Sequence, residues 1–129
     1  MKKDIKQKEW NIKLYKDKNG KCPIKDFMKT LSKDEKEWMT ICIELLKNEG
    51  FKLRRPQCDY LGDDIYELRI KLSGDNTRTL YFFCYENYIV LTHTFIKKTE
   101  KVPENEIKKA IKYKNDFLNR YKIDNIKGA

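Results

Sequence analysis

The fold is decided by residues 65–95, which read IYELRIKLSGDNTRTLYFFCYENYIVLTHTF. This stretch contains three segments with the composition of β-strands, at 65–72, 78–85 and 87–95, separated by short turns rich in Gly, Asp and Asn. The first segment alternates between apolar and charged side chains. The other two are apolar on both faces, as expected for central strands that are covered on both sides. Because turns this short join antiparallel neighbours, the sequence predicts an antiparallel meander.

A further strand and a short helix are predicted upstream of the meander. Residues 8–15 alternate between apolar and polar side chains, a pattern that is typical of a half-buried strand. Pro23 is suited to open a helix, which we predict at 24–31. Residues 51–63 contain Pro, Gly and several charged side chains, and we expect them to form a polar connection.

A longer helix is predicted between these two segments. Ser32 is a typical N-cap residue, and Glu35 three positions later completes a capping box, in which each side chain binds a free backbone amide of the other. Gly50 suits the position directly after the end of the helix. The helical spacing predicts a buried stripe formed by Trp38, Ile41, Cys42, Leu45 and Leu46.

The last predicted element is a helix at 103–121. Pro103 is expected at its first position, and Glu104 and Glu106 in the first turn match the helix dipole. We expect residues 122–129 to be frayed.

The predicted order of elements is therefore β-α-α-β-β-β-α, which indicates an α+β domain with helices on one face of an antiparallel sheet. With 129 residues the chain is expected to form one domain, 1–129, with an ordered core at about 8–121. No run of about 18 apolar residues is present, and the first residues do not resemble a secretory signal, so we expect a cytoplasmic protein without a membrane partner.

The net charge of +9 is concentrated at the two ends of the chain. Residues 1–21 hold 8 lysines against 3 acids, and residues 95–129 hold 10 basic groups against 5 acids. Such an excess favours a polyanion partner, because binding to phosphates releases counterions. A lysine-rich, solubilising surface explains the same charge, so the charge alone leaves both interpretations open.

The cysteine and histidine content argues against a metal site or a cofactor. The four cysteines are scattered without a CxxC pair, and His93 is the only histidine. We therefore expect free thiols, no disulfide, no metal and no small-molecule cofactor. The cysteines are Cys22, Cys42, Cys58 and Cys84.

Charged side chains gather at one edge of the predicted meander. Glu67 and Arg69 are two residues apart and so share one face of their strand, and Arg78 opens the next strand. The segment 95–103, FIKKTEKVP, leads from the last strand to the last helix. If the strands pair as a meander, Arg69, Arg78, Lys97 and Lys98 form a cationic cluster, with Glu67 and His93 as the neighbouring titratable groups.

These residue types suit the cleavage of RNA without a metal ion. RNA carries its own nucleophile, the 2′-hydroxyl, so the enzyme has to align the strand, stabilise the charged transition state and protonate the leaving 5′ oxygen. Arg offers a bidentate clamp for phosphoryl oxygens, and Lys a point charge. Each residue also has a structural interpretation. Glu67 and Arg69 suit a surface ion pair, and His93 suits a packed core position.

The order of these motifs resembles the phage-derived, HigB-like branch of the RelE/ParE toxin superfamily over roughly residues 10–120. The residues that carry the resemblance are Tyr66-Glu67-Leu68-Arg69, Gly74, Arg78, Tyr81-Phe82, Phe95-x-Lys97-Lys98-Thr99-x-Lys101-x-Pro103 and Glu106-x-x-x-Ala110. The resemblance implies a compact microbial ribonuclease-type domain. It also implies the toxin of a type II toxin–antitoxin module that cleaves mRNA on the ribosome and is neutralised by a helix-turn-helix, HigA-like antitoxin.

By position, the resemblance implies that Arg69, Arg78 and Lys98 are catalytic residues that act on the phosphate. Lys71, Lys97 and Lys101 are then expected to bind RNA. Relatives have a Lys where this chain has Glu67, and some use a Tyr near the start of the last helix, where this chain has Ile107. The general acid and base therefore stay open between Glu67, His93, Lys97 and Tyr113.

Two other functions remain compatible with the sequence. Toxins that poison gyrase share the fold that the resemblance implies, and such a toxin needs no ribonuclease site. A phage-derived module that binds RNA or protein without catalysis is the third possibility.

Overall fold

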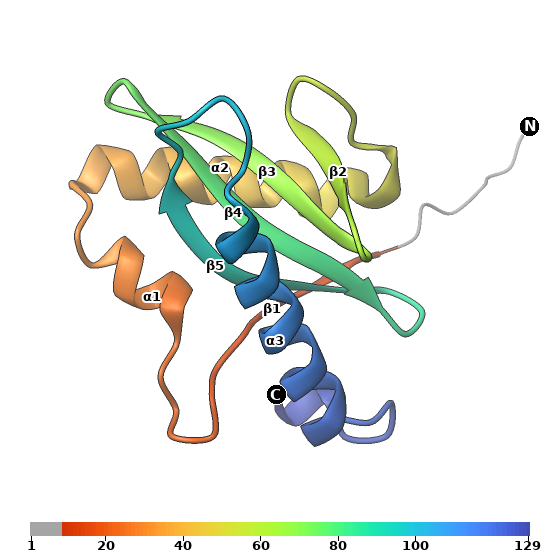
Figure 1. Ribbon diagram of the computed structural model, residues 1–129. Helices are drawn as coiled ribbons and strands as arrows, with labels where there is room; N and C mark the ends of the chain where they lie inside the picture. Colours follow the sequence, from red (N-terminus) through yellow and green to blue (C-terminus); the bar gives the residue numbers. More distant parts are fainter. Residues whose placement is uncertain (1–8) are drawn as a thin grey trace, which may run out of the picture.

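The computed structural model describes residues 9–129 as a five-stranded sheet with helices on both faces (Figure 1). Lys8, the first residue of the predicted N-terminal strand, lies outside the described residues. In chain order the elements are β1 (Asn11–Leu14), α1 (Pro23–Met28), α2 (Lys33–Glu49), a 3₁₀ turn (Gly50–Lys52), β2 (Cys58–Gly62), β3 (Ile65–Leu72), β4 (Asp75–Cys84), β5 (Tyr88–Ile96), α3 (Glu104–Arg120) and a second 3₁₀ turn (Ile126–Gly128).

The sheet confirms the α+β class and the meander, and it adds two features that the sequence analysis missed. The strand order is β1-β5-β4-β3-β2, in which β2 to β5 are antiparallel while β1 pairs with β5 in parallel. The sheet is therefore mixed rather than purely antiparallel. The predicted polar connection 51–63 contains β2, an edge strand whose partly exposed residues lack the apolar pattern of the central strands.

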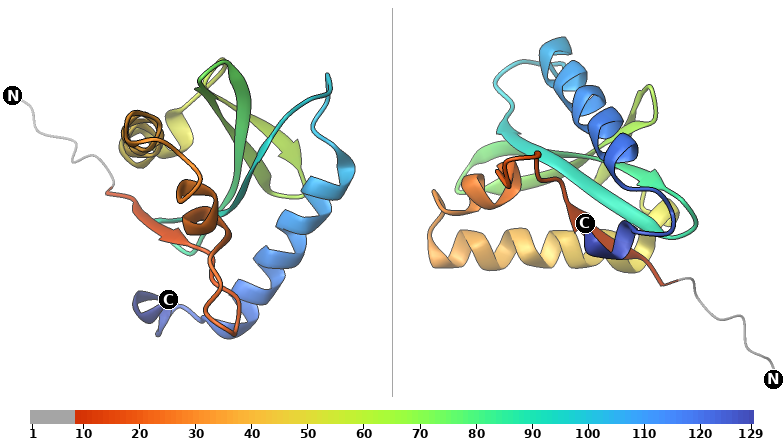
Figure 2. Two further views of the ribbon diagram at one scale, coloured as in Figure 1. Left: turned by 90° about the vertical axis from the view of Figure 1, so that its left-hand side faces the viewer. Right: turned by 90° about the horizontal axis from the view of Figure 1, so that it is seen from below.

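The helices lie on both faces of the sheet, so the prediction of one helical face was wrong. Figure 2 shows α1 and α2 on one side and α3 on the other. Met39 and Leu46 of α2 belong to a core with Leu68 of β3, whereas Ala110 and Phe117 of α3 pack over the other side. The physical reason is in β4 and β5, whose two apolar faces both need cover.

Helix α2 has the predicted ends but a rotated face. The Glu35 amide donates to Ser32 Oγ at 3.2 Å, and the Ser32 amide donates to Glu35 Oε1 at 2.9 Å, which confirms the capping box. Gly50 has a φ of +53°, and a Cβ there would lie 2.0 Å from Nε1 of Trp10. Its place therefore requires glycine. The buried residues of the helix are Met39 and Leu46.

Most of the stripe predicted for α2 lies in solvent. Trp38, Ile41 and Leu45 are 48%, 56% and 39% exposed. The helix is rotated so that Met39 reaches the sheet, and helical spacing alone does not decide which of two neighbouring apolar stripes is buried. The exposed stripe is formed by Trp38, Ile41 and Leu45, and we call it the α2 stripe.

The C-terminal residues are ordered against the sheet, contrary to the prediction that they fray. Ile126 is only 2% exposed, and Nζ of Lys13 in β1 donates to the Lys127 carbonyl at 3.0 Å. The buried Ile126 side chain and this hydrogen bond together hold the segment against the sheet. Helix α3 itself begins at Glu104, with Pro103 as its N-cap rather than its first helical residue.

Candidate active site

Three rows of side chains cross β3, β4 and β5 on the face of the sheet that α3 covers. Residues directly opposite each other in a sheet share a face, and so do residues two positions apart along a strand. The amide of Lys97 donates to the Asn76 carbonyl at 2.7 Å, which continues the pairing just beyond β5. From β3 to β5, the rows are Lys71–Asn76–Lys97, Arg69–Arg78–Phe95 and Glu67–Leu80–His93.

Four charged residues from three strands form what we call the arginine cluster, which consists of Asp59, Glu67, Arg69 and Arg78. Nη2 of Arg69 lies 3.2 Å from Glu67 Oε2 and 3.5 Å from Asp59 Oδ2. Nε of Arg78 lies 2.9 Å from Glu67 Oε1. The predicted meeting of Glu67, Arg69 and Arg78 is therefore present in the structure.

Glu67 holds the two guanidinium groups in place. Its residue is only 4% exposed, and its two carboxylate oxygens face different arginines. The contact with Arg78 is an ion pair rather than a hydrogen bond, because its angle falls outside hydrogen-bond geometry although the two atoms are 2.9 Å apart. A buried carboxylate is stable only beside such partners. The structure bears against the interpretation of Glu67 and Arg69 as a plain surface ion pair, because Glu67 is buried.

The arginine cluster by itself is electrically balanced, with two cations and two anions. Arg69 keeps a third of its side chain exposed, whereas Arg78 is 12% exposed. Lysines around the cluster supply the positive excess that a phosphate would meet. Lys71 and Lys97 lie in the neighbouring row, the first exposed and the second half-buried.

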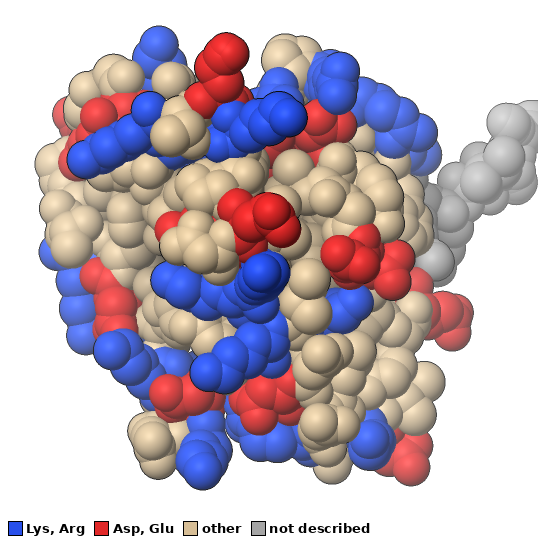
Figure 3. Space-filling model, in the orientation of Figure 1, with Lys and Arg blue, Asp and Glu red and all other residues tan. Residues whose placement is uncertain are grey.

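Lys98 and Lys101 lie in the exposed loop 97–103 that joins β5 to α3. Within residues 9–129 neither side chain forms a hydrogen bond or an ion pair with the arginine cluster. Figure 3 shows Lys and Arg side chains interspersed with Asp and Glu on the face that carries α3, so the positive charge is spread over this face. These lysines can add long-range attraction for an anion without holding it in a fixed position.

His93 is a packed histidine that joins β5 to α3. Its side chain is 5% exposed, Nε2 lies 2.9 Å from Oε1 of Glu106, and Nδ1 lies 3.1 Å from the Thr92 hydroxyl. A neutral ring with its proton on Nε2 donates to Glu106, and the single proton of the Thr92 hydroxyl then lies between two acceptors, Nδ1 and the Leu80 carbonyl, each 3.1 Å away. Burial lowers the pKa of His93, and the opposing effect of the Glu106 carboxylate is smaller. Because Glu106 lies in the first turn of α3, the contact with His93 fixes the start of this helix over the sheet.

Tyr113 lies next to His93 and not at the arginine cluster. Its ring stacks on Tyr15 with centroids 4.4 Å apart, and it meets the His93 ring edge-on at 5.8 Å.

Asp59 is the member of the arginine cluster that was not predicted from the sequence. Because β2 was not predicted, no pattern pointed to Asp59 as a neighbour of Arg69.

No cation site stands out in the part of the chain that the structure describes. In residues 9–129, no three or more His, Cys, Asp or Glu side chains come together in a group able to hold a metal ion. The four cysteines are free thiols. Across the same residues, no helix is both long and apolar enough to cross a membrane.

A comparison with protein families finds a match for this sequence. The family described as "Phage derived protein Gp49-like (DUF891)" matches residues 26–115, more than half of the chain. The chain belongs to the Gp49-like family. This family is associated with toxin–antitoxin modules. The matched range contains the whole arginine cluster and the loop 97–103, while a search of curated proteins finds no match to this Gp49-like chain.

Proposed function

We propose that this Gp49-like protein is the toxin of a type II toxin–antitoxin system and acts as a ribosome-dependent mRNA endoribonuclease. The observation that carries the proposal is the pair of guanidinium groups of Arg69 and Arg78, which are opposite each other on paired strands and share Glu67. The association of the family with toxin–antitoxin modules supports the same class. So does the resemblance of the motifs to the HigB-like branch of the RelE/ParE superfamily.

In the proposed reaction the 2′-hydroxyl oxygen of the RNA bonds to the adjacent phosphorus, and the bond from phosphorus to the 5′ oxygen breaks. The 2′-hydroxyl gives up its proton, the leaving 5′ oxygen takes one up, and the upstream fragment ends in a 2′,3′-cyclic phosphate. Arg69 and Arg78 bind the phosphoryl oxygens and stabilise the negative charge that builds up on them. The cationic side chains thus do the electrostatic work for which other nucleases use a metal ion.

The contacts of Glu67 and His93 argue for positioning rather than proton transfer. Both oxygens of Glu67 face guanidinium groups, and both ring nitrogens of His93 have partners. We therefore assign Glu67 the role of orienting the two arginines, and His93 that of fixing α3. Lys97, half-buried in the row beside the arginines, is our candidate for protonating the 5′ oxygen. Lys71, Lys98 and Lys101 are assigned to RNA attraction.

The α2 stripe supports the antitoxin part of the proposal. Trp38, Ile41 and Leu45 expose a row of large apolar side chains on the side of the sheet opposite the arginine cluster. Contiguous exposed apolar surface marks sites of protein interaction. We propose that the cognate helix-turn-helix antitoxin covers this stripe.

The test uses purified protein with programmed ribosomes and a short mRNA. We expect cuts within the mRNA and upstream fragments that end in a cyclic phosphate or its 3′-phosphate opening product. Activity should persist when EDTA removes the more tightly chelated Zn²⁺ and Mn²⁺ while free Mg²⁺ is kept at the level that ribosomes need. Replacing the 2′-hydroxyl of the target nucleotide by hydrogen or methoxy should block the cut, because the attacking oxygen is then missing or capped.

Cleavage of the 2′-deoxy substrate would overturn the proposed reaction. An intact mRNA together with gyrase-dependent DNA breaks would assign the protein to the gyrase-poisoning class instead. An intact mRNA and intact DNA, with tight RNA binding, would indicate a module without catalysis.

A further inference from the structure

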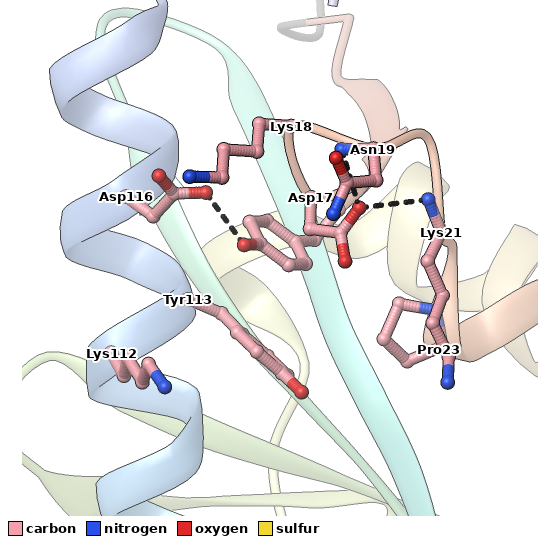
Figure 4. Close-up of a pocket in the computed structure, with 9 residues that line it drawn as sticks. Asp17, Lys18, Asn19, Lys21, Pro23, Lys112, Tyr113 and Asp116 are labelled. Atoms are coloured by element: carbon pink, nitrogen blue, oxygen red, sulfur yellow. Dashed lines mark hydrogen bonds between the residues drawn. The ribbon is translucent and has the colours of Figure 1, made fainter.

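A cavity of about 620 Å³ lies between α3 and the loop that joins β1 to α1 (Figure 4). Its volume falls in the range of small-molecule sites. The cavity is separate from the arginine cluster, none of whose residues lines it. The lining residues are Tyr15, Asp17, Lys18, Asn19, Lys21, Pro23, Lys112, Tyr113 and Asp116.

One wall of the cavity is a rigid aromatic surface. The rings of Tyr15 and Tyr113 stack at 4.4 Å with an angle of 18° between their planes. Tyr15 is buried, and its hydroxyl donates to Oδ2 of Asp116 at 2.6 Å. Burial and this carboxylate raise the pKa of Tyr15 to about 12, so it stays a neutral donor. Tyr113 is only partly buried and is held in a fixed orientation between Tyr15 and His93.

The two carboxylates of the cavity are already engaged within the protein. Oδ1 of Asp17 accepts from the amides of Asn19 at 2.8 Å and Lys21 at 2.9 Å, which shapes the loop. Asp116 accepts from Tyr15 and forms an ion pair with Arg120 at 2.8 Å. These contacts lower the pKa of Asp116 and commit its charge to internal partners.

Lysine side chains remain to meet an anion. Lys21 and Lys112 are exposed, and in Figure 4 they extend on either side of the Tyr113 ring. Among the described residues their ammonium groups form no ion pair. Together with the Tyr113 hydroxyl they place hydrogen-bond donors at the mouth of the cavity, next to an aromatic face.

We infer that this cavity binds a nucleotide, with its base against Tyr113 and its phosphate on Lys21 or Lys112, the two lysines that flank this ring. Aromatic side chains beside cationic ones are the combination that recognises bases and phosphates together. The nucleotide is either a free mononucleotide or one unit of a single-stranded RNA. The inference rests on the cavity alone and does not depend on the proposed cleavage.

The position of the cavity relative to the arginine cluster is compatible with a shared RNA strand. The His93 ring contacts both Tyr113 and Phe95, with centroids 5.8 Å and 5.7 Å away. Phe95 is the direct cross-strand neighbour of Arg78. A continuous band of rings therefore joins the two places on one face of the sheet.

The test is isothermal titration calorimetry on the full-length protein. It measures the affinity for AMP, for inorganic phosphate and for a short single-stranded RNA. The double variant Lys21→Ala/Lys112→Ala removes the proposed phosphate contacts, and Tyr113→Leu removes the stacking surface. The matched control is Lys29→Ala/Lys33→Ala, which removes two exposed lysines that do not line the cavity, one directly after α1 and one at the start of α2. Thermal melting of each variant checks the fold, and the lysine variants change only exposed side chains.

We expect AMP or the RNA to bind, phosphate alone to bind more weakly, and both cavity variants to lose at least about fivefold in affinity, while the control keeps the wild-type value. Binding of AMP identifies a free nucleotide as a sufficient ligand, and binding of the RNA alone identifies the site as part of an RNA path. The inference is overturned if neither ligand binds, if phosphate binds as tightly as the nucleotide, or if the double lysine variant binds like the control.

Discussion

Arg69 and Arg78 are directly opposite each other on β3 and β4, although both carry a positive charge. Like charges in such a pair destabilise a sheet, and the carboxylate of Glu67 compensates by contacting both. The two guanidinium groups are held in place before any substrate arrives. They are therefore preorganised for a phosphate, whose several oxygens can accept hydrogen bonds from both. The arrangement is thus costly for the fold and useful for binding an anion.

Replacing the carboxylate of Glu67 should therefore weaken the fold and strengthen RNA binding. Glu67→Gln leaves the largely buried Arg78 without its counter-charge and leaves the part-exposed Arg69 with Asp59 alone. We expect the free energy of unfolding to fall by about 3–5 kcal/mol. Urea denaturation measures this loss. The same variant should bind RNA more tightly at low salt, because it removes a negative charge next to the proposed phosphate site.

The matched control for this prediction is Asp59→Asn, whose side chain is 24% exposed. Its two ion pairs, with Arg55 at 2.7 Å and Arg69 at 3.5 Å, lie near the surface, so we expect a loss of about 1 kcal/mol at most. Equal losses in the two variants would mean that Glu67 is no more important to the cluster than a surface acid.

Arg78→Ala should lower the rate of mRNA cleavage by about 10²–10³, the loss typical when a group that stabilises a charged transition state is removed. Arg78 also balances the charge of the buried Glu67 carboxylate, so its removal lowers the stability of the fold. The variant must therefore be assayed well below its melting temperature. Arg78→Lys keeps the charge but not the bidentate fork, and we expect an intermediate rate. Cleavage at the wild-type rate by folded Arg78→Ala would exclude Arg78 from phosphate binding.

Leu68→Ala tests the assignment of the strand faces. Leu68 is 1% exposed beneath α2, and truncation of such a residue costs about 2–5 kcal/mol of the free energy of unfolding. The control is Ile41→Ala on the α2 stripe, where 56% exposure predicts a change within about 0.5 kcal/mol. A melting temperature that drops more for Ile41→Ala than for Leu68→Ala would show that α2 faces the sheet with the other stripe.

The stability of the domain should depend on pH through His93. Its pKa is lower in the folded protein than its ordinary value of 6.5, because burial disfavours the imidazolium. Well above pH 6.5 the ring is neutral in both states. As the pH falls below 6.5, the unfolded chain binds a proton that the folded protein does not, so the free energy of unfolding decreases until the folded-state pKa is reached.

The measurement is urea denaturation between pH 8 and pH 4 for the wild type and for His93→Gln. At each pH the two free energies of unfolding are subtracted, which cancels the contribution of the other titrating groups. The wild type should lose stability relative to the variant as the pH falls below 6.5. A difference that stays constant with pH, or that grows in favour of the wild type at low pH, would show that the Glu106 carboxylate outweighs burial.

The ends of α2, the meander and the meeting of Glu67, Arg69 and Arg78 follow from the sequence by itself, whereas α1 ends at Met28 rather than at the predicted residue 31. Ser32 and Glu35 form a local hydrogen-bond pattern that depends only on residues three positions apart. The turns between the three central strands are short, so the register that puts Arg69 opposite Arg78 is set within a stretch of ten residues. Interactions between near neighbours in the chain leave their signature in the sequence.

Only the tertiary structure decided which surfaces are covered. The parallel pairing of β1 with β5, the edge strand β2 with Asp59, and the burial of Met39 rather than Trp38 all depend on contacts between distant segments. The same holds for the cavity between the β1–α1 loop and α3, and for the contact of the His93 ring with Glu106. These features are set by how whole elements pack on the two apolar faces of the sheet, and that packing has no periodic signature in the chain.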